Sequence, residues 1–262
     1  MSARRVPRRA ILAVALAMGA AGCGVIPQAP DPIPSDFVPS PSAEPGDGPG
    51  ALSPDGFTAA QRMTVRVRSV GCSGTIVLST GTGFALDEHT LVTNRHVIAN
   101  SKRITITTYD GRTINVTAAT TSTAADIAVI TTEESLGNAF AQTAEADPEV
   151  GDLVTVVGYP NGGRLTTSSG VVLGATADPL GGAVDSVLAT SATVKVGSSG
   201  SPALDEDGRV IGVVYAKNIS DQSFIVPVST LNALLEEPAL FVPESACAAD
   251  ADASSNASAF LP

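Results

Sequence analysis

The chain has 262 residues, of which 44% are hydrophobic, and its formal net charge is -11. This length allows one large or two small domains with a sizeable hydrophobic core. A chain this acidic is repelled by nucleic acid, so we expect no nucleic-acid partner. The sequence has no cluster of Cys and His at the spacing of a metal site and no phosphate-binding glycine loop, so we expect no metal and no cofactor.

The N-terminal end has the pattern of a secretion signal. Four arginines precede an uncharged run over residues 10–21, which is too short to span a bilayer. The sequence Ala-Ala-Gly-Cys at its end resembles a bacterial lipobox, in which the cysteine becomes the lipidated first residue. We therefore predict a signal peptide over residues 1–22 and a lipid anchor at Cys23, which holds the protein outside the cytoplasmic membrane. Cleavage with full release, or an uncleaved anchor reaching Ile26, is the alternative.

A proline-rich segment follows the signal. Nine of the eighteen prolines of the chain lie between Pro27 and Pro54, among Ser, Gly and Asp residues. Because such a segment cannot bury a core, we predict that residues 23–56 form a tether. The folded domain is predicted over residues 57–248, and the Ala-, Ser- and Asp-rich residues 249–262 are predicted to be a flexible tail.

Short β-type runs follow one another through the folded domain. Residues 64–70 alternate between apolar and polar types, as a half-buried strand does, and Gly, Asp, Asn and Pro separate the runs. A turn-rich segment near residue 145 divides the runs into two sets. Many short strands at this spacing predict an all-β fold, which we interpret as two barrels over 60–138 and 149–227. A short C-terminal helix is predicted from Ser229, as its N-cap, to Glu237.

Three short motifs carry the candidate chemistry. The sequence Gly-Ser-Ser-Gly-Ser-Pro over residues 197–202 displays Ser199 on a tight turn, whose glycines let backbone N–H groups point at a developing oxyanion. Upstream, His96 follows an apolar strand in Leu-Val-Thr-Asn-Arg-His-Val, and Asp126 begins another in Asp-Ile-Ala-Val-Ile. A serine hydroxyl needs a neighbouring base to become a nucleophile. The chain order His, Asp, Ser matches one known arrangement of a catalytic triad.

These motifs resemble those of chymotrypsin-fold serine proteases of the bacterial HtrA/Deg-like branch, and most of all the membrane-anchored actinobacterial proteases of the MarP type. Thr82-Gly83-Phe84, the three motifs and the runs 208–214 and 224–227 occur in the order of the family. The resemblance covers roughly residues 60–237. It implies a chymotrypsin-like fold of two six-stranded antiparallel β-barrels, and a serine endopeptidase acting on protein or peptide substrates. No PDZ module is predicted after the protease domain.

The resemblance and the chemistry together assign roles to the candidate residues. Ser199 is predicted to be the nucleophile, and His96 the general base and acid. Asp126 is predicted to accept a hydrogen bond from the imidazole and to stabilise the imidazolium. The backbone N–H groups of Gly197 and Ser199 are predicted to form the oxyanion hole.

Two competing residues and two departures from the family pattern bear on this assignment. His89 lies in a polar turn and Asp110 in a Tyr-Asp-Gly-Arg hairpin turn, so we expect neither in the site. Ser198 stands where digestive proteases have an aspartate that pairs with a newly cut N-terminus, so activation by that salt bridge is not expected. Ser201 replaces a glycine, a small change that we do not expect to disable the site.

The substrate pocket is predicted from the segments that build it in the family, before and after the serine. The predicted lining residues are Thr193, Val213, Val214 and Tyr215. Thr193 stands near the position of a pocket-bottom acid, so a preference for Arg or Lys before the scissile bond is not expected. A small or medium apolar side chain is the default expectation, and attraction of an acidic side chain by Lys195 or Lys217 is the alternative.

The remaining cysteines suggest one crosslink. If Cys23 is lipidated, Cys72 and Cys247 form an even pair in a secreted chain, which favours a disulfide. The MarP-type proteases that the chain resembles also carry a disulfide in the protease domain. Such a bridge would join the C-terminal segment to the first barrel. Two free thiols are the alternative.

Two other functions compete with the endopeptidase. The first is a catalytically idle protease fold used as a binding module at the cell surface, against which the presence of all three triad residues argues. The second is an esterase with the same acyl-transfer chemistry. Its nucleophile normally sits in an α/β fold with alternating helices, which this β-rich sequence does not predict.

Overall fold

The computed structural model describes residues 52, 54–72, 78–179, 186–218, 220–244 and 247. The predicted signal peptide, Cys23, most of the predicted tether and the predicted tail lie outside them. Within the described part of the chain, no helix combines the length and the apolar character needed to cross a membrane.

The first barrel is an antiparallel sheet that closes on itself. Its strands are β1 (Thr64–Gly71), β2 (Leu78–Ala85), β3 (Thr90–Thr93), β4 (Ser101–Thr107), β5 (Thr113–Ser122) and β6 (Ala128–Thr132). They pair in the order β5-β4-β1-β2-β3-β6, and the pairing of β5 with β6 closes the barrel. The alternation in β1 explains its place: Val65 and Val67 are buried, whereas the side chain of Arg68 lies on the outside.

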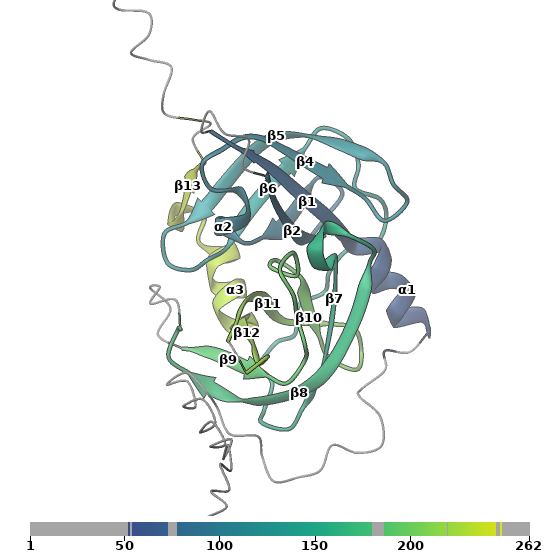
Figure 1. The fold of residues 1–262 in the computed structure, drawn as a ribbon, viewed down its shortest axis with the longest axis vertical. Coiled ribbons are helices and arrows are strands. Elements are labelled where there is room, and N and C mark those ends of the chain that lie inside the picture. The colour runs from purple at the N-terminus through teal and green to yellow at the C-terminus, as the bar shows by residue number, and fades with distance from the viewer. Residues whose placement is uncertain are drawn as a thin grey trace, which may run out of the picture. The chain divides into compact units, whose positions relative to one another are not determined.

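The second barrel repeats this plan with the later strands (Figure 1). Its strands are β7 (Leu153–Gly158), β8 (Thr166–Thr176), β9 (Val187–Thr190), β10 (Pro202–Leu204), β11 (Val210–Lys217) and β12 (Ser223–Pro227). They pair in the order β10-β11-β12-β9-β8-β7, and β10 pairs with β7. The prediction of two six-stranded antiparallel barrels is thereby confirmed.

One hydrophobic cluster joins the two barrels. Phe84 and Val92 of the first barrel belong to the same buried cluster as Val213 and Phe224 of the second, and all four side chains are fully buried. Burial of this apolar surface fixes the barrels against each other. The loops and turns at their interface are therefore held by a packed core.

Three helices accompany the barrels. They are α1 (Pro54–Met63), α2 (Arg95–Ile98) and α3 (Val228–Glu236), and short 3₁₀ turns form η1 (Pro160–Gly162) and η2 (Pro238–Leu240). Helix α1 was not predicted, because it follows directly on a proline-rich segment. It buries Ala60 and Met63 in the shared core, and the Ala60 carbonyl accepts a hydrogen bond from the Thr64 hydroxyl.

The C-terminal helix α3 forms as predicted, but Ser229 does not cap it. The helix begins at Val228, with Pro227 at the N-cap, so Ser229 lies inside the first turn. Its N–H and its hydroxyl both donate to the carboxylate of Asp147, at 2.8 and 2.6 Å. A side chain distant in sequence therefore supplies the acceptor that the first turn of a helix needs.

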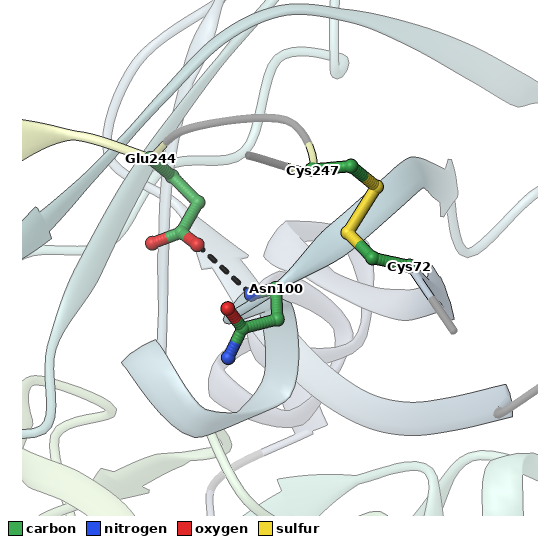
Figure 2. The surroundings of a disulfide bond; sticks show 4 residues. All are labelled: Cys72, Asn100, Glu244 and Cys247. Atoms are coloured by element: carbon green, nitrogen blue, oxygen red, sulfur yellow. Dashed lines mark hydrogen bonds between the residues drawn. A yellow bond between two sulfur atoms is a disulfide. The ribbon is translucent and has the colours of Figure 1, made fainter. Parts of the chain in front are cut away.

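After α3 the chain returns to the first barrel. Strand β13 (Phe241–Pro243) pairs with β5 and extends the first sheet, and Glu244 follows it. The structure joins Cys72 and Cys247 by a disulfide with 5.4 Å between their Cα atoms. Figure 2 shows the N–H of Asn100 donating to the Glu244 carboxylate near this disulfide. The Asn100 carbonyl accepts from the N–H of Cys72.

Candidate active site

His96 and Asp126 form a hydrogen-bonded pair at the surface of the first barrel. His96 lies in α2, directly after β3, and Asp126 lies in the loop between β5 and β6. The imidazole Nδ1 is 2.5 Å from Asp126 Oδ2, and the backbone N–H of His96 donates to Asp126 Oδ1 at 2.9 Å. One carboxylate thus holds both the main chain and the ring of residue 96. With Nδ1–H donated to the carboxylate, Nε2 is left as the proton acceptor.

Hydrogen bonds hold the loop of Asp126 in place, and the His96 ring is partly exposed to solvent. The side-chain amide of Asn94, which is fully buried, donates to the backbone carbonyl of Asp126 at 2.7 Å. The Ser122 hydroxyl accepts from two N–H groups of the same loop. The His96 side chain keeps 46% of its surface exposed, so a substrate can reach its ring. Sequence reasoning did not single out Asn94, although an amide side chain two residues before a candidate histidine was a usable signal.

In the turn that carries Ser199, each backbone carbonyl from residue 196 to residue 199 accepts a hydrogen bond. Two acceptors lie on either side of Gly197: Val196 O accepts from the N–H of Asn161 at 2.6 Å, and Gly197 O accepts from the Thr82 hydroxyl at 2.8 Å. The next two carbonyls accept from the N–H groups of Ser201 and Thr82, at 3.0 and 2.8 Å. The orientation of each peptide group in this turn is therefore fixed.

The N–H groups of the same turn divide into two sets. Those of Ser198, Gly200 and Ser201 donate to backbone carbonyls at 2.7–3.0 Å. Among the described residues, no acceptor takes a hydrogen bond from the N–H of Gly197 or of Ser199. Backbone N–H groups are strong hydrogen-bond donors, so two unused ones on residues 197 and 199 are a ready binding site for a negatively charged oxygen.

The serine turn and helix α2 approach each other across Gly81 of β2. A Cβ atom added at Gly81 would lie 2.6 Å from both γ carbons of Val97 and 3.1 Å from the carbonyl oxygen of Ser199. Val97 follows His96 directly in α2. Because Gly81 has no side chain, the histidine segment and the serine turn can pack closely against the same point of β2.

Two glycines of the turn are required by its geometry. Gly197 has φ = +93° and Gly200 has φ = +84°, both in the region that side chains disfavour. A Cβ atom at Gly197 would also lie 2.7 Å from the carbonyl oxygen of Tyr159. The Gly-Ser-Ser-Gly motif thus builds the turn that the sequence analysis expected from it.

Thr82 is a residue of the site that sequence reasoning missed. It is fully buried in β2, and it holds the serine turn with two groups at once, its N–H and its hydroxyl. The hydroxyl also accepts a hydrogen bond from the N–H of Tyr159 at 3.0 Å. A threonine between two glycines in β2 was the available signal, but its partners in the serine turn and at the start of η1 lie more than 70 residues away in the sequence.

The two departures from the family pattern are both accommodated. Ser198 is buried, and its hydroxyl accepts a hydrogen bond from the Lys195 N–H at 3.3 Å, within its own turn. Ser201 is fully buried, and its hydroxyl has no partner among the described residues. Its side chain fills the space beside Gly158 of β7, where an added Cβ would overlap it. The missing side chain on β7 makes room for the extra one on the turn.

The predicted pocket residues differ in their surroundings. Thr193 lines a hollow of about 170 Å³ together with Lys195 and Ser198, between the serine turn and strands β7 and β8. Val213 and Val214 of β11 are fully buried, in two different core clusters. Val214 nevertheless touches the site, because its backbone pairs with those of Gly200 and Ser201.

Tyr215, the fourth predicted pocket residue, is anchored by its hydroxyl. The hydroxyl donates to the carboxylate of Asp178 at 2.7 Å, and the side chain is only 4% exposed. Burial, and then the hydrogen bond to Asp178, raise the pKa of Tyr215 far above its usual value. The phenol therefore stays neutral and fixes the end of β11 to the loop after β8.

The two competing residues lie away from the pair. His89 is exposed, in a turn whose backbone is held by the carboxylate of Asp87. Asp110 lies in the hairpin between β4 and β5, where hydrogen bonds from Thr108 and Arg112 lower its pKa. No group of three or more His, Cys, Asp or Glu residues in the described structure could hold a metal ion.

Comparison with known proteins identifies the family. The chain matches the family of the trypsin-like peptidase domain over residues 81–213, more than half of its length. This chain belongs to the trypsin-like peptidases. The match includes the segments of His96 and Asp126 and the turn of Ser199, so the resemblance to HtrA-like proteases inferred from the motifs is confirmed.

Relatives of this trypsin-like peptidase include animal and bacterial serine proteases. It is 33% identical over 167 residues to bovine mitochondrial serine protease HTRA2, covering 61% of this chain and 36% of the relative. It is 29% identical over 173 residues to serine protease Rv3671c of Mycobacterium tuberculosis, covering 62% and 42%. The peptidase thus spans well under half the length of these relatives.

A solved structure agrees with the fold of the peptidase. The active form of the Rv3671c protease from M. tuberculosis superposes with a TM-score of 0.66 at 25% identity. The superposition covers 80% of this chain and 94% of that chain. The two-barrel architecture and the sequence family therefore point to the same class of enzyme.

Proposed function

We propose that this trypsin-like peptidase is a serine endopeptidase that cleaves proteins or peptides through an acyl-enzyme. The observation that carries the proposal is the pairing of the His96 ring with Asp126, in a structure whose serine turn keeps two N–H groups unused. An acyl transfer needs a base, a nucleophile and donors for an oxyanion. The residues that the sequence analysis selected supply all three.

In this mechanism Ser199 Oγ attacks the carbonyl carbon of the scissile peptide bond, and His96 Nε2 takes the hydroxyl proton. Asp126 stabilises the imidazolium that forms. The carbonyl oxygen becomes negatively charged and receives hydrogen bonds from the N–H groups of Gly197 and Ser199. Collapse of this intermediate breaks the C–N bond, and His96 gives its proton to the leaving amine. Water then attacks the acyl-enzyme by the same route and regenerates the serine.

The proposal extends to location. The arginine-rich start, the apolar run and the lipobox-like sequence before Cys23 support export and tethering to the outer face of the cytoplasmic membrane. Protein or peptide substrates would then be met outside the cytoplasm. Cleavage of the signal with full release is the alternative within the same proposal.

An idle binding module is the other function considered, and one observation disfavours it. A site that had lost its activity would be free to let the serine turn collapse, with a carbonyl turned into the position of the oxyanion. Here each carbonyl from residue 196 to residue 199 accepts a hydrogen bond, and the two N–H groups stay available. This arrangement supports the enzyme.

The test is active-site labelling with a fluorophosphonate probe, which phosphonylates an activated serine. The full chain, purified in mild detergent, is compared with Ser199→Ala and His96→Ala, followed by peptide mapping. We expect labelling at Ser199 alone and its loss in both variants. Ser201→Ala and His89→Ala are the matched controls, since one hydroxyl has no partner and the other residue is an exposed turn histidine. Absence of labelling in folded wild-type protein would contradict the proposal.

A further inference from the structure

The turn η1 holds the peptide group that carries one of the two unused N–H groups. The N–H of Asn161 donates to the carbonyl of Val196 at 2.6 Å. In a trans peptide the carbonyl and the following N–H point in opposite directions. Fixing the Val196 carbonyl toward η1 therefore fixes the N–H of Gly197 away from η1, on the side of the site.

Turn η1 is itself held from the first barrel by two arginines of β1. Arg66 Nη1 lies 3.1 Å from the carbonyl oxygen of Gly162 and 3.4 Å from that of Gly163. Arg68 Nη2 lies 3.4 Å from the Gly162 oxygen. The Arg66 guanidinium also lies 5.6 Å from the centre of the Tyr159 ring, within the range of a cation–π contact.

The backbone of η1 needs such support. Asn161 has φ = +55° and Gly162 has φ = +63°, so two successive residues adopt the left-handed conformation. A non-glycine residue in this region costs about 1–3 kcal/mol and persists only where its surroundings hold it. The conformation is also what aims the Asn161 N–H at Val196. The strain in η1 and the orientation of the Gly197 peptide are thus linked.

Arg66 is not the residue that stability alone would select here. Its Nε atom is buried with no hydrogen-bond partner among the described residues, and so is the hydroxyl of Thr80, which stands opposite Arg68 on β2. Leaving buried polar atoms unpaired costs free energy that an apolar side chain of the same length would avoid. The guanidinium is kept despite this cost, which points to a use for its remaining donors.

We propose that Arg66, assisted by Arg68, is a positioning residue for the oxyanion hole. The arginines hold the carbonyls of η1, η1 holds the carbonyl of Val196, and the Gly197 N–H is thereby directed at the oxyanion. The inference rests on the proposed function. It makes that function depend on the contact between the arginines of β1 and turn η1. Neither arginine touches the substrate in this scheme.

The test uses Arg66→Met, Arg68→Met and the double variant in the full chain. Methionine keeps an unbranched stem but removes the donors and, at position 66, the cation over the Tyr159 ring. Arg103→Met is the matched control, because Arg103 is an exposed arginine on the neighbouring strand β4. Three quantities are measured: the rate of fluorophosphonate labelling at Ser199, kcat and KM on a peptide substrate, and the melting temperature.

We expect Arg66→Met to slow labelling and lower kcat about tenfold, and the double variant about 100-fold, near the effect of losing one oxyanion donor. KM and the melting temperature stay close to wild type. The amide resonance of Gly197 shifts in NMR spectra, whereas the downfield proton between His96 and Asp126 does not. Arg66→Lys, which keeps one donor group, recovers part of the rate. Arg103→Met changes none of these quantities.

Three results would overturn the inference. If wild-type protein labels at Ser199 and the double variant labels equally fast, the positioning role of the arginines is refuted and the proposed function remains intact. If kcat and the melting temperature fall together and the downfield proton resonance disappears, the arginines have a merely structural role. If wild-type protein does not label at Ser199, the proposed function is contradicted, and the positioning role of the arginines is contradicted as well.

Discussion

At the scale of single residues, the site depends on a hydroxyl that performs no chemistry. Thr82 Oγ1 donates to the Gly197 carbonyl and accepts from the Tyr159 N–H, both buried. Thr82→Val keeps the shape but leaves both partners unpaired, at about 1–3 kcal/mol each. We expect labelling of Ser199 to slow by about 100-fold, because the peptide that carries an oxyanion donor loses its support.

Thr82→Ser is the control for this prediction, since it restores the hydroxyl and removes only a methyl group. Its labelling rate should stay within a few-fold of wild type, whereas its stability falls slightly. Both quantities are measured, by fluorophosphonate labelling and by urea denaturation. Equal labelling rates for the valine and serine variants would show that the hydroxyl is dispensable.

The glycines of the chain differ in what they tolerate, although several share the same backbone angle. Gly200 has φ = +84° and Gly208 has φ = +81°. A Cβ atom at Gly200 would overlap the Thr82 carbonyl oxygen, whereas at Gly208 its nearest neighbour is the Cα of Gly56 at 3.8 Å. Gly208→Ala should cost about 1–2 kcal/mol of unfolding free energy, for the left-handed backbone alone.

Gly200→Ala should cost roughly 1–3 kcal/mol more, because the added methyl group overpacks the turn. It should also abolish labelling of Ser199, which Gly208→Ala should preserve. Urea denaturation and active-site labelling of the two variants measure the difference. Similar stability of the two variants would contradict the packing argument.

At the scale of elements, helix α3 receives its N-terminal acceptor from the segment between the barrels. Asp147 accepts from both the N–H and the hydroxyl of Ser229. Asp147→Ala should lower the unfolding free energy by about 1 kcal/mol, the usual effect of losing a capping carboxylate. Asp207→Ala, in an exposed ion pair with Arg209, is the control and should change it by less than about 0.5 kcal/mol. Urea denaturation followed by circular dichroism compares the two.

Most strands were predicted from local patterns, whereas two elements were not predicted. The alternation of β1 and the apolar runs of β11 and β12 identify them as strands. Helix α1 was missed because it follows directly on a proline-rich segment, and strand β13 has no pattern of its own. The three residues of β13 are too few to show a period, and they become a strand because β5 offers an open edge to pair with.

At the scale of the whole molecule, the disulfide joins the end of β1 to the end of the chain that the structure describes. Cys72 and Cys247 are 175 residues apart, so the bridge closes nearly the whole domain. A loop of this length gives up to about 5 kcal/mol in the chain-entropy description, and measured values are about 2–5 kcal/mol. The variant with both Cys72→Ser and Cys247→Ser should lose stability in this range.

Urea denaturation with and without reductant measures this loss. Reduced wild-type protein should match the serine variant, and the variant itself should not respond to reductant. The hydrogen bond between Asn100 and Glu244 remains in both, so β13 keeps one attachment to the segment after α2 (Figure 2). Equal stability of oxidised and reduced wild-type protein would contradict the prediction.

The sequence by itself determined the class of fold and the candidate residues of the site. Strand periodicity is a local property, and the motifs around His96, Asp126 and Ser199 are each contiguous, so both could be read without coordinates. The sequence also placed Ser199 on a turn that only glycines can build.

Only the tertiary structure decided how that turn is held. Thr82, Arg66 and the peptide of Asn161 act on segments that lie 35–117 residues away in the sequence, and these meet only when two barrels close and pack together. The same holds for the predicted pocket: Thr193 lines a hollow beside the serine turn, whereas the Val213 side chain is buried in the core that joins the barrels. Hydrogen-bond partners across an interface depend on the relative placement of whole barrels, which no local pattern encodes.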